Sequence, residues 1–97
     1  MSTGELYKAE LSRLREAFGA NVRRMRREKG PRFSQERLAE ATDLHRTEIG
    51  KIEQGTVEPR LSTLLILADA LSVSIDDLVA GLWVPVERRP PPQQQDI

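Results

Sequence analysis

Cysteine is absent from this chain of 97 residues, and histidine occurs only once, as His45. The lack of thiols excludes disulfides, cysteine nucleophiles and thiolate metal sites. A histidine-based catalytic triad would have to be built on His45, and one chain with a single histidine cannot supply a multi-histidine metal centre. We therefore expect neither an enzymatic activity nor a bound metal or cofactor.

Long apolar runs are missing as well. No stretch approaches the roughly 18 apolar residues that a transmembrane helix needs. The first five residues lack the basic-then-apolar profile of a secretory signal peptide. With 38% apolar and 31% charged residues, the composition is typical of a soluble globular protein, and the length corresponds to one domain. We expect a cytoplasmic protein without membrane contact.

The net charge is zero, but the charges are distributed unevenly along the chain. Residues 13–37 hold nine basic against three acidic residues, whereas residues 38–87 hold three basic against nine acidic residues. Such an asymmetry can place a positive field on one side of a neutral molecule, which would suit a nucleic acid. The alternative is a solvated helix face that another helix balances, and charge alone does not decide between the two.

The first part of the chain has the pattern of an amphipathic helix. Residues 5–29 contain no proline, and apolar side chains recur there every three or four positions along one helical stripe. Gly19 interrupts the stripe at a cost of about 1 kcal/mol relative to alanine. The segment therefore forms either one long helix or two helices joined near Gly19, and Gly30-Pro31 ends it. The stripe consists of Leu11, Leu14, Phe18, Val22 and Met25.

Four shorter helices are predicted after this segment. Ser34 is a suitable N-cap for the second helix, which should end near residues 42–43. The third covers about residues 46–53, and Gly55 follows it at the usual place of a left-handed C-cap. The fourth is rich in leucine and is expected to lie in the core, and Ser74 opens the fifth. The apolar residues of the fourth helix are Leu61, Leu64, Leu65, Leu67, Ala68 and Leu71.

The second and third helices have the spacing of a helix-turn-helix. They are separated by a turn of about three residues and share an apolar interior. The outer side of the third helix carries short or basic groups, which suits insertion into the major groove of B-DNA. The interior consists of Leu38, Ala39, Leu44, Ile49 and Ile52, and the outer side of Arg46, Thr47, Gly50 and Lys51.

Together these motifs resemble the phage repressor/Cro-like (Xre-type) helix-turn-helix family over roughly residues 18–82. The resemblance implies an all-α, five-helix bundle like that of lambda repressor, with an extended first helix. It also implies a regulator of transcription that binds specific sites in double-stranded DNA as a homodimer and acts as a repressor at the nucleoid. The residues that carry the resemblance are Val22 to Gly30, Ser34 to Ala39, Ile49 to Gly55, Pro59, Leu64 to Leu71 and Val73 to Leu78.

The same resemblance implies a set of DNA contacts. Gln35 matches a residue at the start of the second helix that touches a phosphate or a base edge, and Arg60 matches a phosphate contact after the next loop. His45 matches the N-cap of the third helix, where the family more often has serine or threonine. Arginine can grip guanine O6 and N7 with two hydrogen bonds, and threonine offers a hydroxyl and a methyl group. The base-facing positions of the third helix correspond to Arg46, Thr47 and Lys51.

Arg26 and Glu53 match a buried or half-buried ion pair that ties the first helix to the third. Glu53 lies in the last turn of a short helix, where the helix dipole disfavours a negative charge, and a partner such as Arg26 explains its presence. The chain departs from the family pattern in three places. Residues 31–33 lengthen the first loop by about two residues, Asp43 stands where glycine is frequent, and Glu48 places an acid on the recognition helix. Aspartate accepts a left-handed conformation, so we expect the turn to survive.

We divide the chain into a helical extension (residues 1–17), the helix-turn-helix domain (18–82), and an apolar then Pro/Gln-rich tail (83–97). The tail is expected to be disordered from about residue 88, because its composition cannot build a core. Trp83 either covers the core of its own domain or anchors a dimer, since tryptophan favours the centres of interfaces.

Other functions remain open at this point. An antitoxin or restriction-modification controller of the same fold would bind DNA and also grip a partner protein through its apolar termini. A protein-interaction domain that has lost DNA binding is favoured by the acidic segment of residues 38–87 and by Glu48. An enzyme is disfavoured, because no set of nucleophile, base and orienting group and no phosphate-binding loop is visible.

Overall fold

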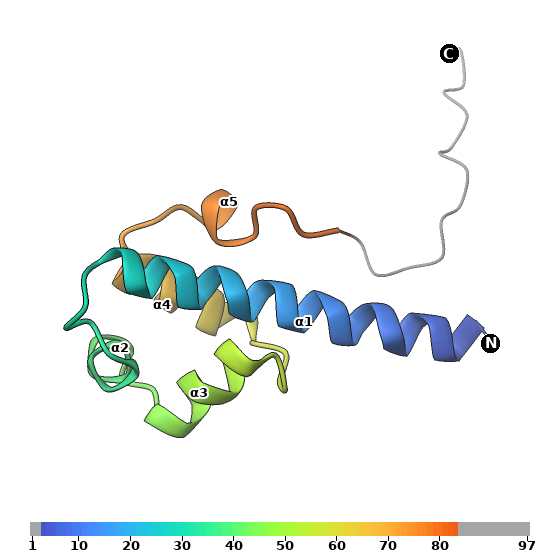
Figure 1. Cartoon of the computed structure of the whole chain (residues 1–97), viewed down its shortest axis with the longest axis horizontal. Helices are drawn as coiled ribbons and strands as arrows, with labels where there is room; N and C mark the ends of the chain where they lie inside the picture. The colour runs from blue at the N-terminus through green and yellow to red at the C-terminus, as the bar shows by residue number, and fades with distance from the viewer. Residues whose placement is uncertain (1–2, 84–97) are drawn as a thin grey trace, which may run out of the picture.

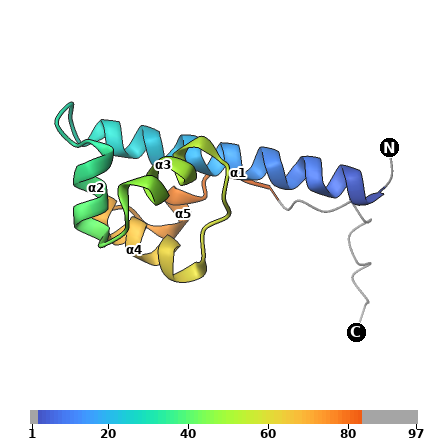
Figure 2. The same cartoon turned by 90° about the horizontal axis from the view of Figure 1, so that it is seen from below.

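The longest element of the fold is a single helix. The structure, a computed structural model, describes residues 3–83, and α1 (Thr3–Glu28) runs through Gly19 without a break. Of the two arrangements that the sequence allows, the chain therefore adopts one long helix. The C-terminal half of α1 packs on the other helices, while its N-terminal end projects beyond them (Figure 1, Figure 2).

Four shorter helices follow, and side-chain caps mark the start of three of them, of which two are serines. Ser34 Oγ accepts a hydrogen bond from the Arg37 amide at 3.1 Å, and Ser74 Oγ accepts one from the Asp77 amide at 3.0 Å. Each bond satisfies an amide that the first turn of a helix leaves without a partner. Residues 3–83 form five helices and no strand, so the predicted all-α, five-helix fold is confirmed. The shorter helices are α2 (Gln35–Thr42), α3 (Arg46–Gln54), α4 (Leu61–Leu71) and α5 (Ile75–Leu78).

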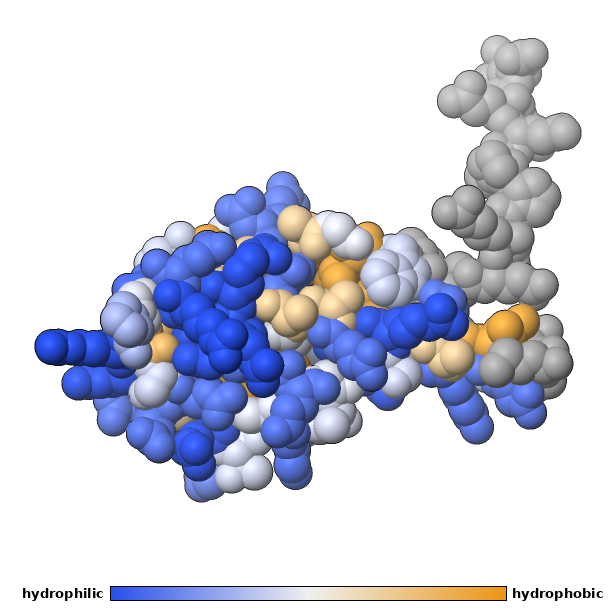
Figure 3. Space-filling view, in the orientation of Figure 1, coloured by the Kyte–Doolittle hydropathy of each residue, from blue (hydrophilic) through white to orange (hydrophobic). Residues whose placement is uncertain are grey.

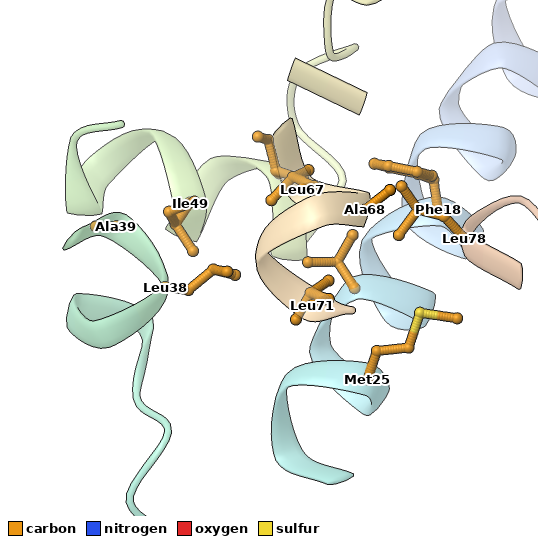
Figure 4. Packing of buried hydrophobic residues seen from close by; sticks show 11 residues of the cluster. Phe18, Met25, Leu38, Ala39, Ile49, Leu67, Ala68, Leu71 and Leu78 are labelled. Carbon is orange, nitrogen blue, oxygen red and sulfur yellow. The ribbon is translucent and has the colours of Figure 1, made fainter. Parts of the chain in front are cut away.

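All five helices contribute to one apolar core (Figure 4). Leu38 from α2, Ile49 from α3 and Leu67 from α4 are completely buried. In the predicted helix-turn-helix interior, Leu44 is partly buried and the other four residues are buried. Removing apolar surface from water in this way stabilises the fold by roughly 25 cal/mol per Å². The core consists of Phe18, Val22, Met25, Leu38, Ala39, Ile49, Ile52, Leu67, Ala68, Leu71 and Leu78.

The expectation that the leucines of α4 all lie in the core is wrong for two of them. Leu61 is 73% exposed and Leu65 is 54% exposed, whereas Leu67 and Leu71 are buried. The physical reason is that α4 carries apolar residues around its whole circumference. Only one side of it faces α1, α2 and α5, so the leucines on the other side remain on the surface.

The backbones of α1 and α3 come into close contact at two glycines, Gly19 within α1 and Gly55 at the end of α3. A Cβ atom on Gly19 would overlap the Ile52 carbonyl oxygen and lie 2.6 Å from that of Glu53. At Gly55, which has φ of 77° and caps α3, a Cβ atom would lie 2.6 Å from Glu16 Cα. Gly19 is therefore not a helix break but the residue that lets α1 cross the C-terminal end of α3 at backbone distance.

The segment after α5 is tied back onto α1. The buried Asn21 side chain donates hydrogen bonds from Nδ2 to the carbonyl oxygens of Leu78 and Ala80, both at 3.0 Å. Further along, Trp83 Nε1 donates to Glu10 Oε2 at 2.7 Å. Trp83 is 41% exposed and is not part of the buried cluster, so it lies against the extended part of α1 rather than over the core.

Two predictions about the ends of the chain are not decided. Residues 84–97, including the Pro/Gln-rich part, lie outside the residues that the structure describes. The division between an extension (1–17) and a domain (18–82) also stays a prediction, since α1 passes through residue 17 without interruption. None of the helices in the described part of the chain is long and apolar enough to cross a membrane.

The contact between α1 and α3 predicts opposite effects for two helical glycines. Gly19→Ala should lower the free energy of unfolding by about 1–3 kcal/mol, the usual cost of overpacking, because its methyl group meets backbone. Gly50→Ala is the matched control, since a Cβ atom there meets only Gln35 Oε1, at 3.8 Å. It should add up to about 1 kcal/mol through helix propensity. Urea denaturation of both variants measures this, and a Gly19→Ala variant as stable as the parent would contradict the proposed packing.

Candidate nucleic-acid interface

Helix α3 presents one face to the core and the other to solvent. Its inner face is buried and consists of Ile49, Ile52 and Glu53. The opposite face, which the sequence predicts to point outward, is exposed in the structure. The exposed side chains are Arg46, Thr47, Glu48, Lys51 and Gln54. Because the buried residues anchor the helix, its outer face is a rigid platform for binding.

The turn before α3 is closed by local hydrogen bonds. Asp43 adopts the left-handed conformation with φ of 58°, as expected for an aspartate at this position. Thr42 Oγ1 donates to the Leu38 carbonyl oxygen at 2.7 Å and accepts from the Leu44 amide at 3.3 Å. These bonds fix the three residues between α2 and α3, and with them the angle at which α3 leaves α2.

His45 is the N-cap of α3, as the resemblance implies. Its Nδ1 atom accepts a hydrogen bond from the Thr47 amide at 3.1 Å. The imidazole nitrogen thus accepts the hydrogen bond that a serine or threonine hydroxyl accepts at other N-caps. Glu48 lies in the first turn of the same helix, where the helix dipole favours a negative charge.

A buried carboxylate joins three helices beneath this face. The side chain of Glu53 has no exposed surface. Arg26 donates to it twice, from Nε to Oε2 at 2.7 Å and from Nη2 to Oε1 at 3.0 Å. Gln35 Nε2 donates to Oε1 at 3.1 Å, and Arg23 Nε lies 3.5 Å from the same oxygen. Arg26 also donates from Nη1 to the Phe33 carbonyl oxygen at 3.0 Å, so its guanidinium fixes the loop before α2 as well.

This network changes the pKa of both partners of the ion pair. Burial alone raises the pKa of Glu53, because it disfavours the charged form. The hydrogen bonds from Arg26 and Gln35 and the charge of Arg26 outweigh burial, and the pKa of Glu53 lies below its ordinary value. The hydrogen bond to Glu53 raises the pKa of Arg26. Both groups are therefore charged at neutral pH.

One end of the Gln35 side chain, the amide nitrogen, already takes part in this network. The sequence predicts it as a contact to a phosphate or a base edge, but its amide nitrogen points inward to Glu53. Its Oε1 atom lies on the side of Gly50, 3.8 Å from where a Cβ atom of that residue would be. The structure therefore leaves the carbonyl end of Gln35 as the group that can face a ligand.

Arg46 has a partner on α2 that sequence reasoning missed. Its Nε atom lies 3.2 Å from Glu36 Oε1, and both side chains are largely exposed. The two residues are ten positions apart on different helices, so no helical spacing signals the pair. Only the angle between α2 and α3 brings them together.

Basic side chains gather in two areas, one beside α3 and one at the loop between α1 and α2. A groove between α3 and residues 57–66 is lined by Thr47, Lys51 and Arg60, and by the acids Glu48 and Glu58. Arg60 is exposed at the N-cap of α4 and makes no side-chain cap bond.

The second basic area surrounds the lengthened loop between α1 and α2. A shallow pocket there is lined by Lys29, Arg32, Phe33 and Arg37, and Lys29 Nζ lies 5.6 Å from the centre of the Phe33 ring. In Figure 3 hydrophilic side chains cover the α2 and α3 end of the molecule, and apolar ones gather along the segment after α5 and the start of α1. Within residues 3–83, no group of three or more potential metal ligands comes together.

The chain is similar to known helix-turn-helix proteins and to two control proteins. Residues 22–78 match the family model described as "Helix-turn-helix". Control protein C.SmaI of Serratia marcescens is 44% identical over 66 residues, which cover 68% of this chain and 76% of that protein. Control protein C.BamHI of Bacillus amyloliquefaciens is 42% identical over 66 residues, which cover 68% and 80%.

A solved structure shows the same arrangement. The crystal structure of the restriction-modification controller protein C.AhdI from Aeromonas hydrophila superposes with a TM-score of 0.63 at 36% identity. The match covers 66% of this chain and 94% of that one. About a third of the present chain therefore has no counterpart in that controller.

The lowered pKa of Glu53 predicts a specific pH dependence of stability. A carboxylate with a lowered pKa contributes stability above its ordinary pKa of 4.5, and this is lost as the pH falls through the lower folded value. Glu53→Gln should cost roughly 3 kcal/mol at neutral pH, because Arg26 loses its counter-ion in a buried site. The stability difference from the parent should stay constant down to about pH 5 and shrink below pH 4.5.

Urea denaturation at several pH values between about 3 and 7 measures this difference. Glu40→Gln, which removes an exposed acid from α2, is the control and should differ little from the parent at every pH. A difference between parent and Glu53→Gln that is the same at about pH 3 and pH 7 would show that the carboxylate does not supply the stability.

Proposed function

From the premise that the chain belongs to the Xre-type helix-turn-helix family of DNA-binding transcriptional regulators, we propose that α3 enters the major groove and reads a specific site. The observation that carries this proposal is the exposure of Arg46, Thr47 and Lys51 on a helix whose opposite face is fully anchored in the core. A helix with its caps satisfied and its inner face packed presents these groups without reorganisation.

Each side chain of the interface has a distinct proposed role. Arg46 grips a guanine through O6 and N7, and Thr47 contacts a thymine methyl or a base edge. Lys51 and Arg60 line the groove beside α3 and bind phosphates. Gln35 accepts through Oε1, since Nε2 is held by Glu53. His45, whose Nδ1 atom caps α3, contacts a phosphate through Nε2.

We further propose that the protein acts as a homodimer on a near-palindromic operator and represses transcription in the cytoplasm, at the nucleoid. Dimers of this fold place their recognition helices about 34 Å apart, one turn of DNA. A second copy of the chain could cover its exposed apolar side chains, which include Leu61 and Leu65 on α4 and Leu6 and Tyr7 at the start of α1. The same apolar start of α1 suits a protein partner.

A more specific role is favoured by the relatives. Two of them are named control proteins, and C.AhdI is a restriction-modification controller, so we propose regulation of restriction-modification genes as the second candidate. A restriction endonuclease or methyltransferase gene beside this one would support it. A toxin gene there would favour the antitoxin reading instead.

Selection of bound duplexes from a random DNA pool tests the proposal as a whole. We expect a motif with two symmetric half-sites spaced by about one helical turn. Recovery of a motif without symmetry would contradict the proposal that the protein binds DNA as a homodimer. If no duplex binds in a gel shift at low salt, the result would favour the alternative of a protein-interaction domain that has lost DNA binding.

Arg46→Ala should cost roughly 1–3 kcal/mol of binding free energy on the selected duplex and relax the preference at one base. Arg13→Ala removes the same charge from the exposed start of α1 and should leave that preference unchanged. Titrations of both variants on the selected duplex and on single-base substitutions measure the difference. Equal weakening on selected and random DNA would refute a base-reading role.

Arg60→Ala should weaken binding similarly on all sequences, because a phosphate contact carries no sequence information. The plot of log affinity against log salt concentration should become shallower by about one unit of slope, since one counterion fewer is released. Binding isotherms at several salt concentrations measure this. An unchanged slope would remove Arg60 from the interface.

A further inference from the structure

The structure assigns Glu36 as a positioning residue that holds the Arg46 guanidinium for base reading. Arg46 is the first residue of α3, and its Nε atom lies 3.2 Å from Glu36 Oε1. This inference rests on the proposed function, because it needs Arg46 to read a base. It adds an acidic residue on α2 to the residues proposed to contact DNA, which are neutral or basic.

The geometry of the pair leaves the reading edge of Arg46 open. A guanidinium has a side edge that includes Nε and an end edge formed by Nη1 and Nη2. Glu36 Oε1 lies 3.2 Å from Nε as an ion pair, and Arg46 makes no hydrogen bond and no other ion pair within residues 3–83. The end edge can therefore donate to guanine O6 and N7 while the ion pair persists.

Because both side chains of the pair are exposed, losing the pair can change DNA recognition without changing the stability of the fold. The Arg46 side chain is 63% exposed and the Glu36 side chain 67%. Exposed ion pairs contribute little to stability, so the loss of this pair should not unfold the protein. What the pair restricts is the plane and rotamer of a long side chain, which has many conformations when it is not held.

The neighbouring residues do not provide an alternative partner. Gln35, which precedes Glu36 on α2, donates its amide to Glu53. Glu40 lies one turn further along α2, is exposed, and makes no ion pair in the part of the chain that the structure describes. Glu36 is thus the acid of α2 that is placed against the first residue of the recognition helix.

The test measures discrimination, which is the ratio of affinities for the selected duplex and for duplexes in which the guanine read by Arg46 is replaced. The full chain is compared with Glu36→Ala, Glu36→Gln, Arg46→Ala, the double variant of both alanines, and Glu40→Ala. Glu40→Ala is the matched control, because it removes the same charge from the same helix. Either loss of an acid should raise the affinity for every duplex by a similar small factor through reduced repulsion of phosphates.

We expect Glu36→Ala to reduce discrimination at that guanine by about three- to tenfold, whereas Glu40→Ala leaves it unchanged. Glu36→Gln keeps the size of the side chain but removes its charge, so it should lose discrimination as Glu36→Ala does, because the contact is an ion pair. In the Arg46→Ala background, the removal of Glu36 should have no further effect on discrimination. The unfolding midpoint of Glu36→Ala should stay near that of the parent, which excludes a purely structural cause.

Two outcomes overturn the inference, and they are distinguishable. If Glu36→Ala behaves like Glu40→Ala while Arg46→Ala still abolishes discrimination, Glu36 does not position Arg46 and the proposed function stands. If Arg46→Ala itself leaves discrimination unchanged, the base-reading role of Arg46 is wrong, and the inference fails with it.

Discussion

The orientation of the recognition helix depends on the buried carboxylate of Glu53. A charge without exposed surface is costly unless other groups donate to it, and here α1 supplies Arg26 while α2 supplies Gln35. The carboxylate lies near the C-terminal end of α3, so its donors hold that end against α1 and the start of α2. The beginning of α3 is held by the turn at Asp43 and the His45 cap. With both ends fixed, the outer face has one orientation.

That ion pair requires α1 and α3 to approach more closely than side chains normally allow. Gly19 and Gly55 remove the two Cβ atoms that would keep the helices apart, and the guanidinium of Arg26 then reaches Glu53 with two hydrogen bonds. The close contact and the ion pair therefore support each other. A pair at longer distance would have to be hydrated, which the complete burial of the Glu53 side chain excludes.

Much of the fold follows from local chemistry, and the rest from contacts between distant residues. Ser34, Ser74 and Gly55 mark helix ends because caps act within one turn. The resemblance to the family implies the Arg26–Glu53 pair, and a negative charge at the C-terminal end of a helix explains why Glu53 needs a partner. By contrast, the sequence does not show that Leu61 and Leu65 are exposed, because a helix that is apolar all round gives no inner face. The inward turn of Gln35 and the partner of Arg46 depend on angles between helices, which no sequence spacing encodes.

The ion pairs of the structure show that the basic segment of the sequence is not a basic surface of the same extent. Most arginines of α1 are matched by acids, as in Arg15 with Glu58 and Arg24 with Glu28, so the basic segment is largely balanced within the domain. Five of the cations outside such pairs lie beside α3 or around the loop between α1 and α2, and they are Lys29, Arg32, Arg37, Lys51 and Arg60. A neutral protein can in this way present a local positive field at one end. Because such a field attracts every duplex alike, in the proposed mode of binding the choice among sequences rests on the few side chains of α3 whose positions the buried network and α2 determine.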